Sequence, residues 1–188
     1  YQRPYIGSMA EKFPGVQDNG GIYLHPSAWK LAVDSILRRP DRVEEGLRKM
    51  LPWDQTYDDG TVGQTCGEPY AMYNSYFAPE VGYRAGTPGQ SWRTASSSWM
   101  LKSVIEFIFG MHPEVEGLRI DPCIPLCWNE CSIKKVMRDC TFDVHFICDG
   151  EGSDVLGITV DGEAIDGNII APVAGKTIKV EVKLGKKA

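Results

Sequence analysis

The spacing of apolar residues changes once along the chain, near His112 and Pro113. Before this point they recur every three or four residues, which predicts helices with one buried face. After it they alternate with polar residues, which predicts half-buried strands. We therefore expect a helical region at residues 1–112 and a β region at residues 113–188.

Three helices are predicted in the first region. The first begins at Pro26 and stops before Pro40, with an apolar face formed by Trp29, Ala32, Val33, Ile36 and Leu37. The second follows Asp41, which is a candidate N-cap. The third starts near Trp92 and ends at Gly110, a candidate C′ glycine.

Short alternating segments predict strands in the second region. They lie at residues 118–120, 142–146, 155–160 and 178–182, and Asp161–Gly162 is typical of a turn. We expect these strands to form a small antiparallel unit of the sandwich type.

Composition excludes several classes of function. The chain has 188 residues and a net charge of −5, with no basic stripe, so nucleic acid is not an expected partner. The longest apolar stretch contains Lys102 and Glu106, so no membrane span is expected. The six cysteines include no Cys-x-x-Cys pair, which favours reduced thiols in a cytoplasmic protein over a metal site.

Three polar segments could carry chemistry: QDNGGIYLH (17–25), CGEPYAMYN (66–74) and QSWRTASSSW (90–99). In the first, two adjacent glycines allow a close backbone approach, and His25 stands where helix N–H groups attract anions. The second combines a carboxylate, an amide and phenols, as carbohydrate platforms do. The third places hydroxyls at a helix N-terminus. The structural alternatives are a tight turn, a packed aromatic loop and a serine-rich helical turn.

Four segments in this order resemble the C-terminal part of the glycoside hydrolase family 94 phosphorylases. They are NGGIYLH (19–25), GEPYAMYN (67–74), SWRTASSSW (91–99) and GLRIDPCIP (117–125), and the resemblance spans about residues 15–140. The family includes cellobiose and cellodextrin phosphorylases. The stretch NGGIYLHPSAWKLAVD looks closest to the cellodextrin branch.

The resemblance implies a fold and a reaction. The chain would supply the last helices of an (α/α)6 toroid, followed by a small antiparallel β-sandwich-like domain. The reaction would be the reversible, inverting phosphorolysis of β-glucosides to α-glucose 1-phosphate, with phosphate as a substrate and no cofactor. The chain begins at Tyr1 without Met, so we expect the remainder of a longer enzyme, often a homodimer, as its partner.

The resemblance also implies a phosphate site. His25 matches the family's phosphate-contacting histidine. Thr94 and Ala95 match a Thr-Gly pair that holds phosphate through a hydroxyl and a backbone N–H, and Ala95 departs from that glycine.

Substrate-binding positions can be matched in the same way. Gln17 and Asp18 stand where cellobiose phosphorylases have Lys and Glu, which puts disaccharide specificity in doubt. Asn74 matches a sugar-binding Gln, and Glu68 and Tyr70 match a Glu-Pro-Tyr motif. No residue matches the family's catalytic Asp, which lies upstream, so the chain alone is expected to be inactive.

Three other interpretations remain open. The complete protein could be a related toroidal glycoside hydrolase that uses water as its nucleophile. The β region and the aromatic segment could instead form a noncatalytic carbohydrate-binding fragment. The chain could also be a purely structural accessory fragment.

Overall fold

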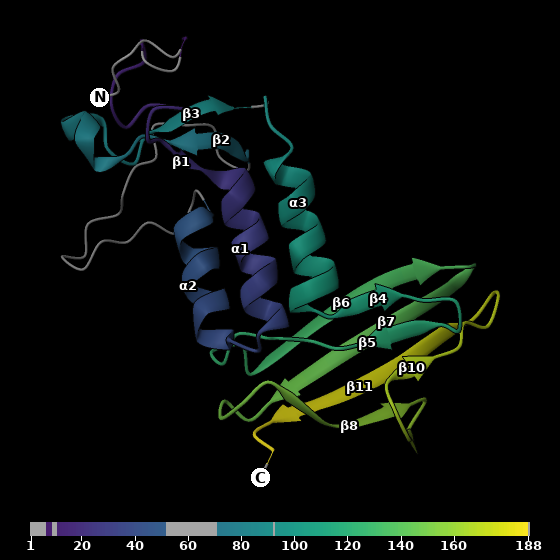
Figure 1. Cartoon of the computed structure of the whole chain (residues 1–188). Coiled ribbons are helices and arrows are strands. Elements are labelled where there is room, and N and C mark those ends of the chain that lie inside the picture. The colour runs from purple at the N-terminus through teal and green to yellow at the C-terminus, as the bar shows by residue number, and fades with distance from the viewer. Residues whose placement is uncertain (1–6, 9–10, 52–70, 92, 188) are drawn as a thin grey trace. The chain divides into compact units, whose positions relative to one another are not determined.

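The computed structural model describes residues 7–8, 11–51, 71–91 and 93–187 (Figure 1). The chain divides into two compact units. Unit 1 is Tyr1–Lys30 with Glu45–Leu101, and unit 2 is Leu31–Glu44 with Lys102–Ala188. The limits between the two units fall within helices. The domain boundary expected after residue 112 stays a prediction.

Unit 1 contains a small antiparallel sheet in the order β1-β2-β3. Its strands are β1 (Ile22–Tyr23), β2 (Tyr73–Tyr76) and β3 (Pro88–Ser91). A 3-10 turn, η1 (Pro79–Arg84), connects β2 to β3. Tyr73 and Tyr76 are buried, so β2, the central strand, anchors the sheet in the core of the unit.

The first helix, α1 (Leu24–Ile36), starts before the expected Pro26. A proline fits within the first turn because the N–H that it lacks has no helical partner there. The predicted buried face is largely wrong. Of its five residues only Ala32 is buried, whereas Leu24, Ala28 and Leu31 form most of the buried face.

The second helix is α2 (Pro40–Met50), and the prediction that Asp41 is its N-cap is wrong. It begins at Pro40, and Asp41 lies inside the first turn rather than before it. The first helical carbonyl is that of Arg39, which accepts a hydrogen bond from Val43 N–H at 3.0 Å. Proline is common at the first helical position because its φ is already close to that of a helix.

The third helix, α3 (Ser96–Lys102), starts later than the expected Trp92 and continues as a π-helix, η2 (Ser103–Ile108). Phe109 N–H donates to the Val104 carbonyl at 2.9 Å, the five-residue step of a π-helix. Gly110 follows at φ +65°, which confirms the predicted C′ glycine.

Unit 2 contains two sheets, in the orders β10-β5-β4 and β6-β7-β11-β8-β9. The strands are β4 (Met111–Pro113), β5 (Leu118–Ile120), β6 (Glu130–Met137), β7 (Cys140–Cys148), β8 (Asp154–Val160), β9 (Glu163–Ile165), β10 (Ile169–Ile170) and β11 (Thr177–Gly185). The strands predicted from alternation are confirmed as β5, β7, β8 and β11. The turn predicted at Asp161–Gly162 connects β8 to β9.

The larger sheet is mixed, which corrects the antiparallel expectation. β11 runs parallel to β7, from Thr177 opposite Thr141 to Leu184 opposite Cys148. It runs antiparallel to β8 on its other side. Side-chain alternation fixes which face of a strand is buried, but it does not specify the neighbouring strand or its direction.

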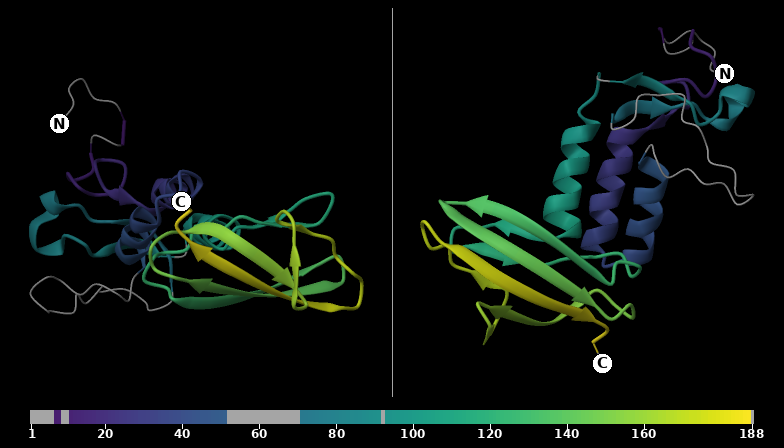
Figure 2. Two further views of the ribbon diagram at one scale, coloured as in Figure 1. Left: turned by 90° about the horizontal axis from the view of Figure 1, so that it is seen from below. Right: turned by 180° about the vertical axis from the view of Figure 1, so that it is seen from behind.

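The core of unit 2 lies on the inner faces of its two sheets, and the smaller sheet lies against the larger one (Figures 1 and 2). From the larger sheet, Phe142, Val144 and Phe146 are 0% exposed, as are Leu118 and Ile120 from the smaller sheet. This two-layered arrangement agrees with the sandwich-like architecture that was expected.

The five cysteines that the structure describes are all free thiols. Cys123 and Cys140 are buried, Cys131 and Cys148 are half-buried, and Cys127 is exposed. Among the described residues, no helix combines the length and the apolar character needed to cross a membrane.

Gly110 gives a direct test of the fold. A Cβ on this residue would lie 2.1 Å from the Asp121 carbonyl carbon, and φ is already positive. We expect Gly110→Ala to lower the free energy of unfolding by more than about 3 kcal/mol. Urea denaturation followed by circular dichroism measures this loss.

Gly162→Ala is the matched control. Gly162 has φ +91°, but a Cβ at this position would have no other atom within 4 Å, so only the backbone cost of about 1 kcal/mol applies. Equal losses in the two variants would contradict the close approach of Gly110 to Asp121.

Candidate functional site

The sheet of unit 1 brings two helix N-termini to the same end of that unit. β1 and β3 both pair antiparallel with β2, so they run in the same direction. β1 leads directly into Leu24 of α1, and β3 leads within a few residues into Ser96 of α3. The first and third polar segments are therefore neighbours, although they are far apart in the sequence (Figure 1).

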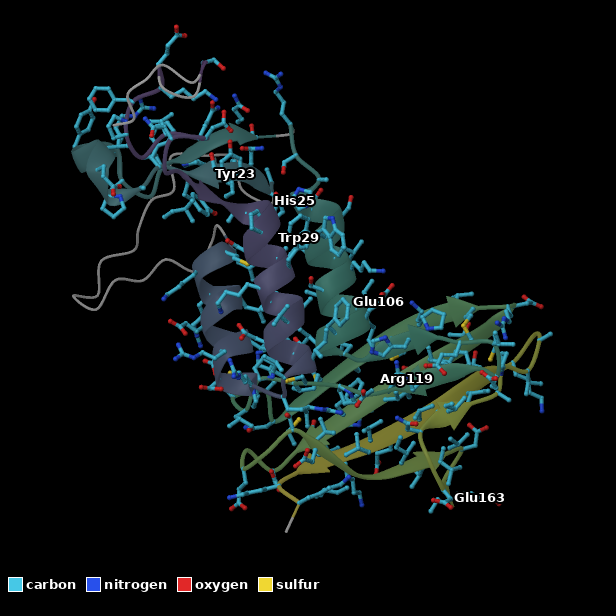
Figure 3. The ribbon with its side chains drawn as sticks, viewed as in Figure 1. Tyr23, His25, Trp29, Glu106, Arg119 and Glu163 are labelled. Atoms are coloured by element: carbon cyan, nitrogen blue, oxygen red, sulfur yellow. The ribbon has the colours of Figure 1, made fainter. Side chains whose placement is uncertain are left out.

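Three aromatic rings join these helix ends. His25 and Trp29, one turn apart on α1, have ring centroids 4.8 Å apart in an edge-on arrangement (Figure 3). Trp99 of α3 lies 6.2 Å from His25 and 5.7 Å from Trp29. We call these three residues the aromatic cluster. Edge-to-face packing of this kind holds the imidazole in one orientation.

The His25 side chain has an unsatisfied polar atom. Its Nε2 is buried and has no hydrogen-bond partner in the part of the chain that the structure describes. An unpaired buried polar atom lowers the stability of the folded state by about 1–3 kcal/mol, and such atoms are therefore rare in native proteins. This nitrogen, at the first turn of α1, therefore has unused hydrogen-bonding capacity.

Thr94 and Ala95 lie at the start of α3. Thr94 Oγ1 accepts a hydrogen bond from the Ser96 N–H at 3.0 Å and lies 2.6 Å from Ser96 Oγ. Ala95 is exposed, and its carbonyl accepts from Trp99 N–H at 3.1 Å. The Thr94 hydroxyl therefore satisfies the first N–H of the helix.

The glycine-rich segment before β1 is a tight turn. Gly21 N–H donates to the Gln17 carbonyl at 2.8 Å, and Gly15 N–H donates to the Asn19 carbonyl at the same distance. A Cβ on Gly21 would lie 2.5 Å from the Gln17 nitrogen, so the turn requires glycine at this position. Gln17 itself has φ +47° and is half-buried.

Asp18 is held by two neighbours. One carboxylate oxygen accepts from Lys12 Nζ and the other from the Tyr23 hydroxyl. These hydrogen bonds, with that from Lys12 the stronger, lower the pKa of Asp18. Burial, together with the Asp18 carboxylate, raises the pKa of Tyr23 to about 12. Asp18 is therefore ionised at neutral pH and is not suited to donate a proton.

The second polar segment is described only in part. Glu68 and Tyr70 lie outside the described residues. Asn74 is on β2 and half-buried, and alternation along the strand turns it away from buried Tyr73 and Ser75. Ser75 Oγ is the second buried polar atom without a partner among the described residues.

Two features of this site were not predicted from the sequence. Trp29 was assigned to the buried face of a helix, and Trp99 to a helix start. Trp29 follows His25 by four residues, a spacing that brings helical side chains into contact, so this pair was accessible from the sequence. The contact with Trp99 depends on strand order, which no local pattern encodes.

The described residues contain no group of three or more His, Cys, Asp or Glu side chains that could hold a metal ion. The groups present at these two helix ends are an imidazole and two indoles, which are in contact, together with hydroxyls and backbone N–H groups. This set suits a tetrahedral anion and the apolar face of a sugar.

Comparison with known proteins identifies similar sequences. Residues 2–110 match the family model described as the glycosyl hydrolase 94 superfamily, catalytic domain. The chain is 33% identical over 182 residues to a solabiose phosphorylase of Paenibacillus borealis, covering 95% of this chain and 23% of that protein. It is 30% identical over 181 residues to an N,N'-diacetylchitobiose phosphorylase of Vibrio furnissii. The match covers 96% of this chain and 22% of that protein.

A cellobionic acid phosphorylase of Neurospora crassa is 29% identical over 145 residues, covering 76% of this chain and 18% of that protein. The chain thus spans less than a quarter of the length of these three relatives.

The Thr94 cap can be tested by substitution. Thr94→Val keeps the shape of the side chain but removes the oxygen that accepts from Ser96 N–H. We expect it to lower the free energy of unfolding by about 1 kcal/mol, whereas Thr94→Ser should retain most of the stability. Chemical denaturation of the two variants distinguishes them, and identical losses would exclude a capping role for the hydroxyl.

Proposed function

This chain belongs to the glycosyl hydrolase 94 superfamily, and on that basis we propose that it provides the phosphate-facing part of an inverting β-glucoside phosphorylase. The observation that supports the proposal is the buried Nε2 of His25 at the N-terminal end of α1, which has no hydrogen-bond partner among the residues that the structure describes. The relatives described above are named phosphorylases, and phosphate is the nucleophile in phosphorolysis.

In this proposal phosphate lies between the two helix starts. His25 Nε2 donates one hydrogen bond to it, and the N–H groups in the first turn of α1 contribute a favourable dipole. Thr94 contributes its hydroxyl and Ala95 its backbone N–H. The alanine in place of glycine keeps this donor, because the backbone N–H does not depend on the side chain.

The proposed reaction needs only one acid. Phosphate is already anionic at pH 7 and attacks the anomeric carbon directly, so no general base is required. A carboxylic acid protonates the leaving oxygen, as in inverting hydrolases. Asp18 does not fill that role, because its hydrogen bonds favour the carboxylate. We assign the acid to an Asp in another part of the enzyme.

The proposed substrate is a β-glucoside of the cellobiose or cellodextrin type, cleaved reversibly to α-glucose 1-phosphate. Gln17, Asp18 and Asn74 would line the sugar subsites, with Glu68 and Tyr70 from the adjoining segment. The names of the three relatives specify different disaccharides, which is consistent with a variable acceptor subsite. Trp29, 47% exposed, offers an aromatic surface beside His25.

The wider setting belongs to the same proposal. The helices of this chain would complete an (α/α)6 toroid with the remainder of a cytoplasmic, homodimeric enzyme. No cofactor is proposed, because phosphate enters as a substrate.

We expect the 188-residue chain alone to be catalytically inert. The proposed acid is not among its residues, so leaving-group protonation would be missing. Incubation with α-glucose 1-phosphate and cellobiose, followed by a colorimetric phosphate assay, should show no release above the protein-free blank. Release that scales with the concentration of the chain would contradict this assignment.

In the complete phosphorylase, His25→Ala should raise the apparent KM for phosphate by about tenfold to a hundredfold. This range corresponds to the loss of one hydrogen bond to a charged group, about 1.5–3 kcal/mol. Initial rates at varied phosphate concentration give the value. His145→Ala is the control, because His145 is a partly exposed residue on β7. Unchanged phosphate kinetics in His25→Ala would remove this residue from the site.

A further inference from the structure

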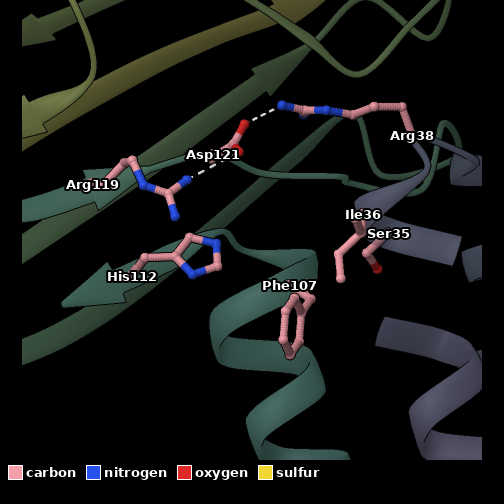
Figure 4. A pocket seen from close by; sticks show the side chains of 7 residues that line it. All are labelled: Ser35, Ile36, Arg38, Phe107, His112, Arg119 and Asp121. Atoms are coloured by element: carbon pink, nitrogen blue, oxygen red, sulfur yellow. Dashed lines mark hydrogen bonds and ion pairs between the residues drawn. The ribbon is translucent and has the colours of Figure 1, made fainter. Parts of the chain in front are cut away.

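A cavity lies wholly within unit 2. It has a volume of about 390 Å³ and is lined by residues from the end of α1, the end of η2 and strands β4 and β5 (Figure 4). Small-molecule sites commonly have volumes of about 300–1,000 Å³. None of its lining residues belongs to the polar segments assigned to phosphate and substrate.

One wall of the cavity is a fixed polar network. Asp121 accepts from both Arg38 and Arg119, with Arg119 Nη1 at 3.1 Å (Figure 4). Arg38 also donates to the Pro122 carbonyl at 2.5 Å, and Arg119 Nε donates to Glu114. A guanidinium has five N–H donors, so each arginine retains donors beyond these contacts. The network is ordered before any ligand arrives.

The polar wall carries little net charge. Both arginines are paired with carboxylates. Burial and then the Arg119 charge lower the pKa of His112, against opposing effects of Asp121, Glu106 and Glu114. The imidazole is therefore neutral at pH 7, with one donor and one acceptor nitrogen. A phosphate ion would meet the Asp121 carboxylate in this wall, which disfavours an anionic ligand.

The other wall is apolar. Phe107 lies with its ring centroid 5.9 Å from that of His112, at an interplanar angle of 75°. It belongs to the π-helical turn η2, a rare geometry that often occurs at functional sites. Ile36, which is 63% exposed, lines the cavity as well. A flat aromatic surface thus faces a space bordered by paired polar groups.

We propose that this cavity binds a neutral glycosyl unit. A pyranose ring has an apolar C–H face, which packs on Phe107, and hydroxyls around its edge. Each hydroxyl both donates and accepts, so it matches the free N–H groups of Arg119, the lone pairs of Asp121 and the two nitrogens of His112. This would be a glycan-binding site separate from the phosphate-facing residues of unit 1.

The proposal can be tested on the 188-residue chain by amide NMR. Cellobiose and inorganic phosphate are titrated separately, and backbone signals are followed for both units. We expect cellobiose to shift the signals of His112, Arg119 and Asp121 saturably, and phosphate to leave them in place. The absence of a saturable cellobiose shift would overturn the proposal, as would equal shifts with phosphate.

Two variants and a control localise the binding. Phe107→Leu removes the aromatic surface. Ile36→Arg adds a long side chain beside the cavity, and because Ile36 is exposed we expect this variant to fold normally. Each should weaken cellobiose binding at least tenfold, whereas Phe13→Leu, at an exposed phenylalanine of unit 1, should not. Unchanged affinity in Ile36→Arg, or equal weakening in Phe13→Leu, would contradict the assignment.

The outcome is independent of the proposed phosphate site. Phosphate shifts near His25 report on the proposed function alone, whereas cellobiose shifts at His112, Arg119 and Asp121 report on the cavity alone.

Discussion

The pairing of β2 with a strand on each side is the constraint on which the candidate site depends. Because β1 and β3 are both antiparallel to β2, they must run in the same direction. Each strand leads toward a helix, so the starts of α1 and α3 come to one end of unit 1. Backbone hydrogen bonds, rather than direct attraction between the polar segments, therefore bring His25 close to Trp99.

Within that frame, the side chains of His25 and Asp18 differ in how far their polar atoms are satisfied. Trp29 and Trp99 contact the imidazole through their rings and offer no strong hydrogen-bond acceptor, so Nε2 remains unpartnered among the described residues. The folded chain bears the cost of this unpaired atom, which a bound oxyanion would offset. Asp18, by contrast, is satisfied by Lys12 and Tyr23, and so stabilises the turn before β1 as a fixed carboxylate.

The sequence predicted local features well because they depend on neighbouring residues. Alternation identified β7 and β11, and the position of Gly110 predicted the end of a helix. The parallel pairing of these two strands was not predicted, because side-chain alternation is the same for either direction. The buried face of α1 was also misjudged, since this helix has apolar residues on more than one face and tertiary contacts decide which is covered.

The same distinction applies to the candidate site. The segment containing His25 and the segment containing Thr94 were each predicted to be a helix start with anion-binding chemistry; the helix starts are confirmed, and the anion binding stays a prediction. Their proximity follows from strand order, which is a property of the whole unit. The π-helical turn that carries Phe107 was equally inaccessible, because its apolar spacing resembles that of an ordinary helix.

In the proposed function, the two helix starts of unit 1 form one anion site. The most direct measurement is an anomalous difference map from crystals of the chain soaked in arsenate, a tetrahedral analogue of phosphate. We predict a single strong peak within hydrogen-bond distance of His25 Nε2 and the start of α3. A peak confined to other residues, such as Arg38 and Arg119, with none beside His25, would contradict it.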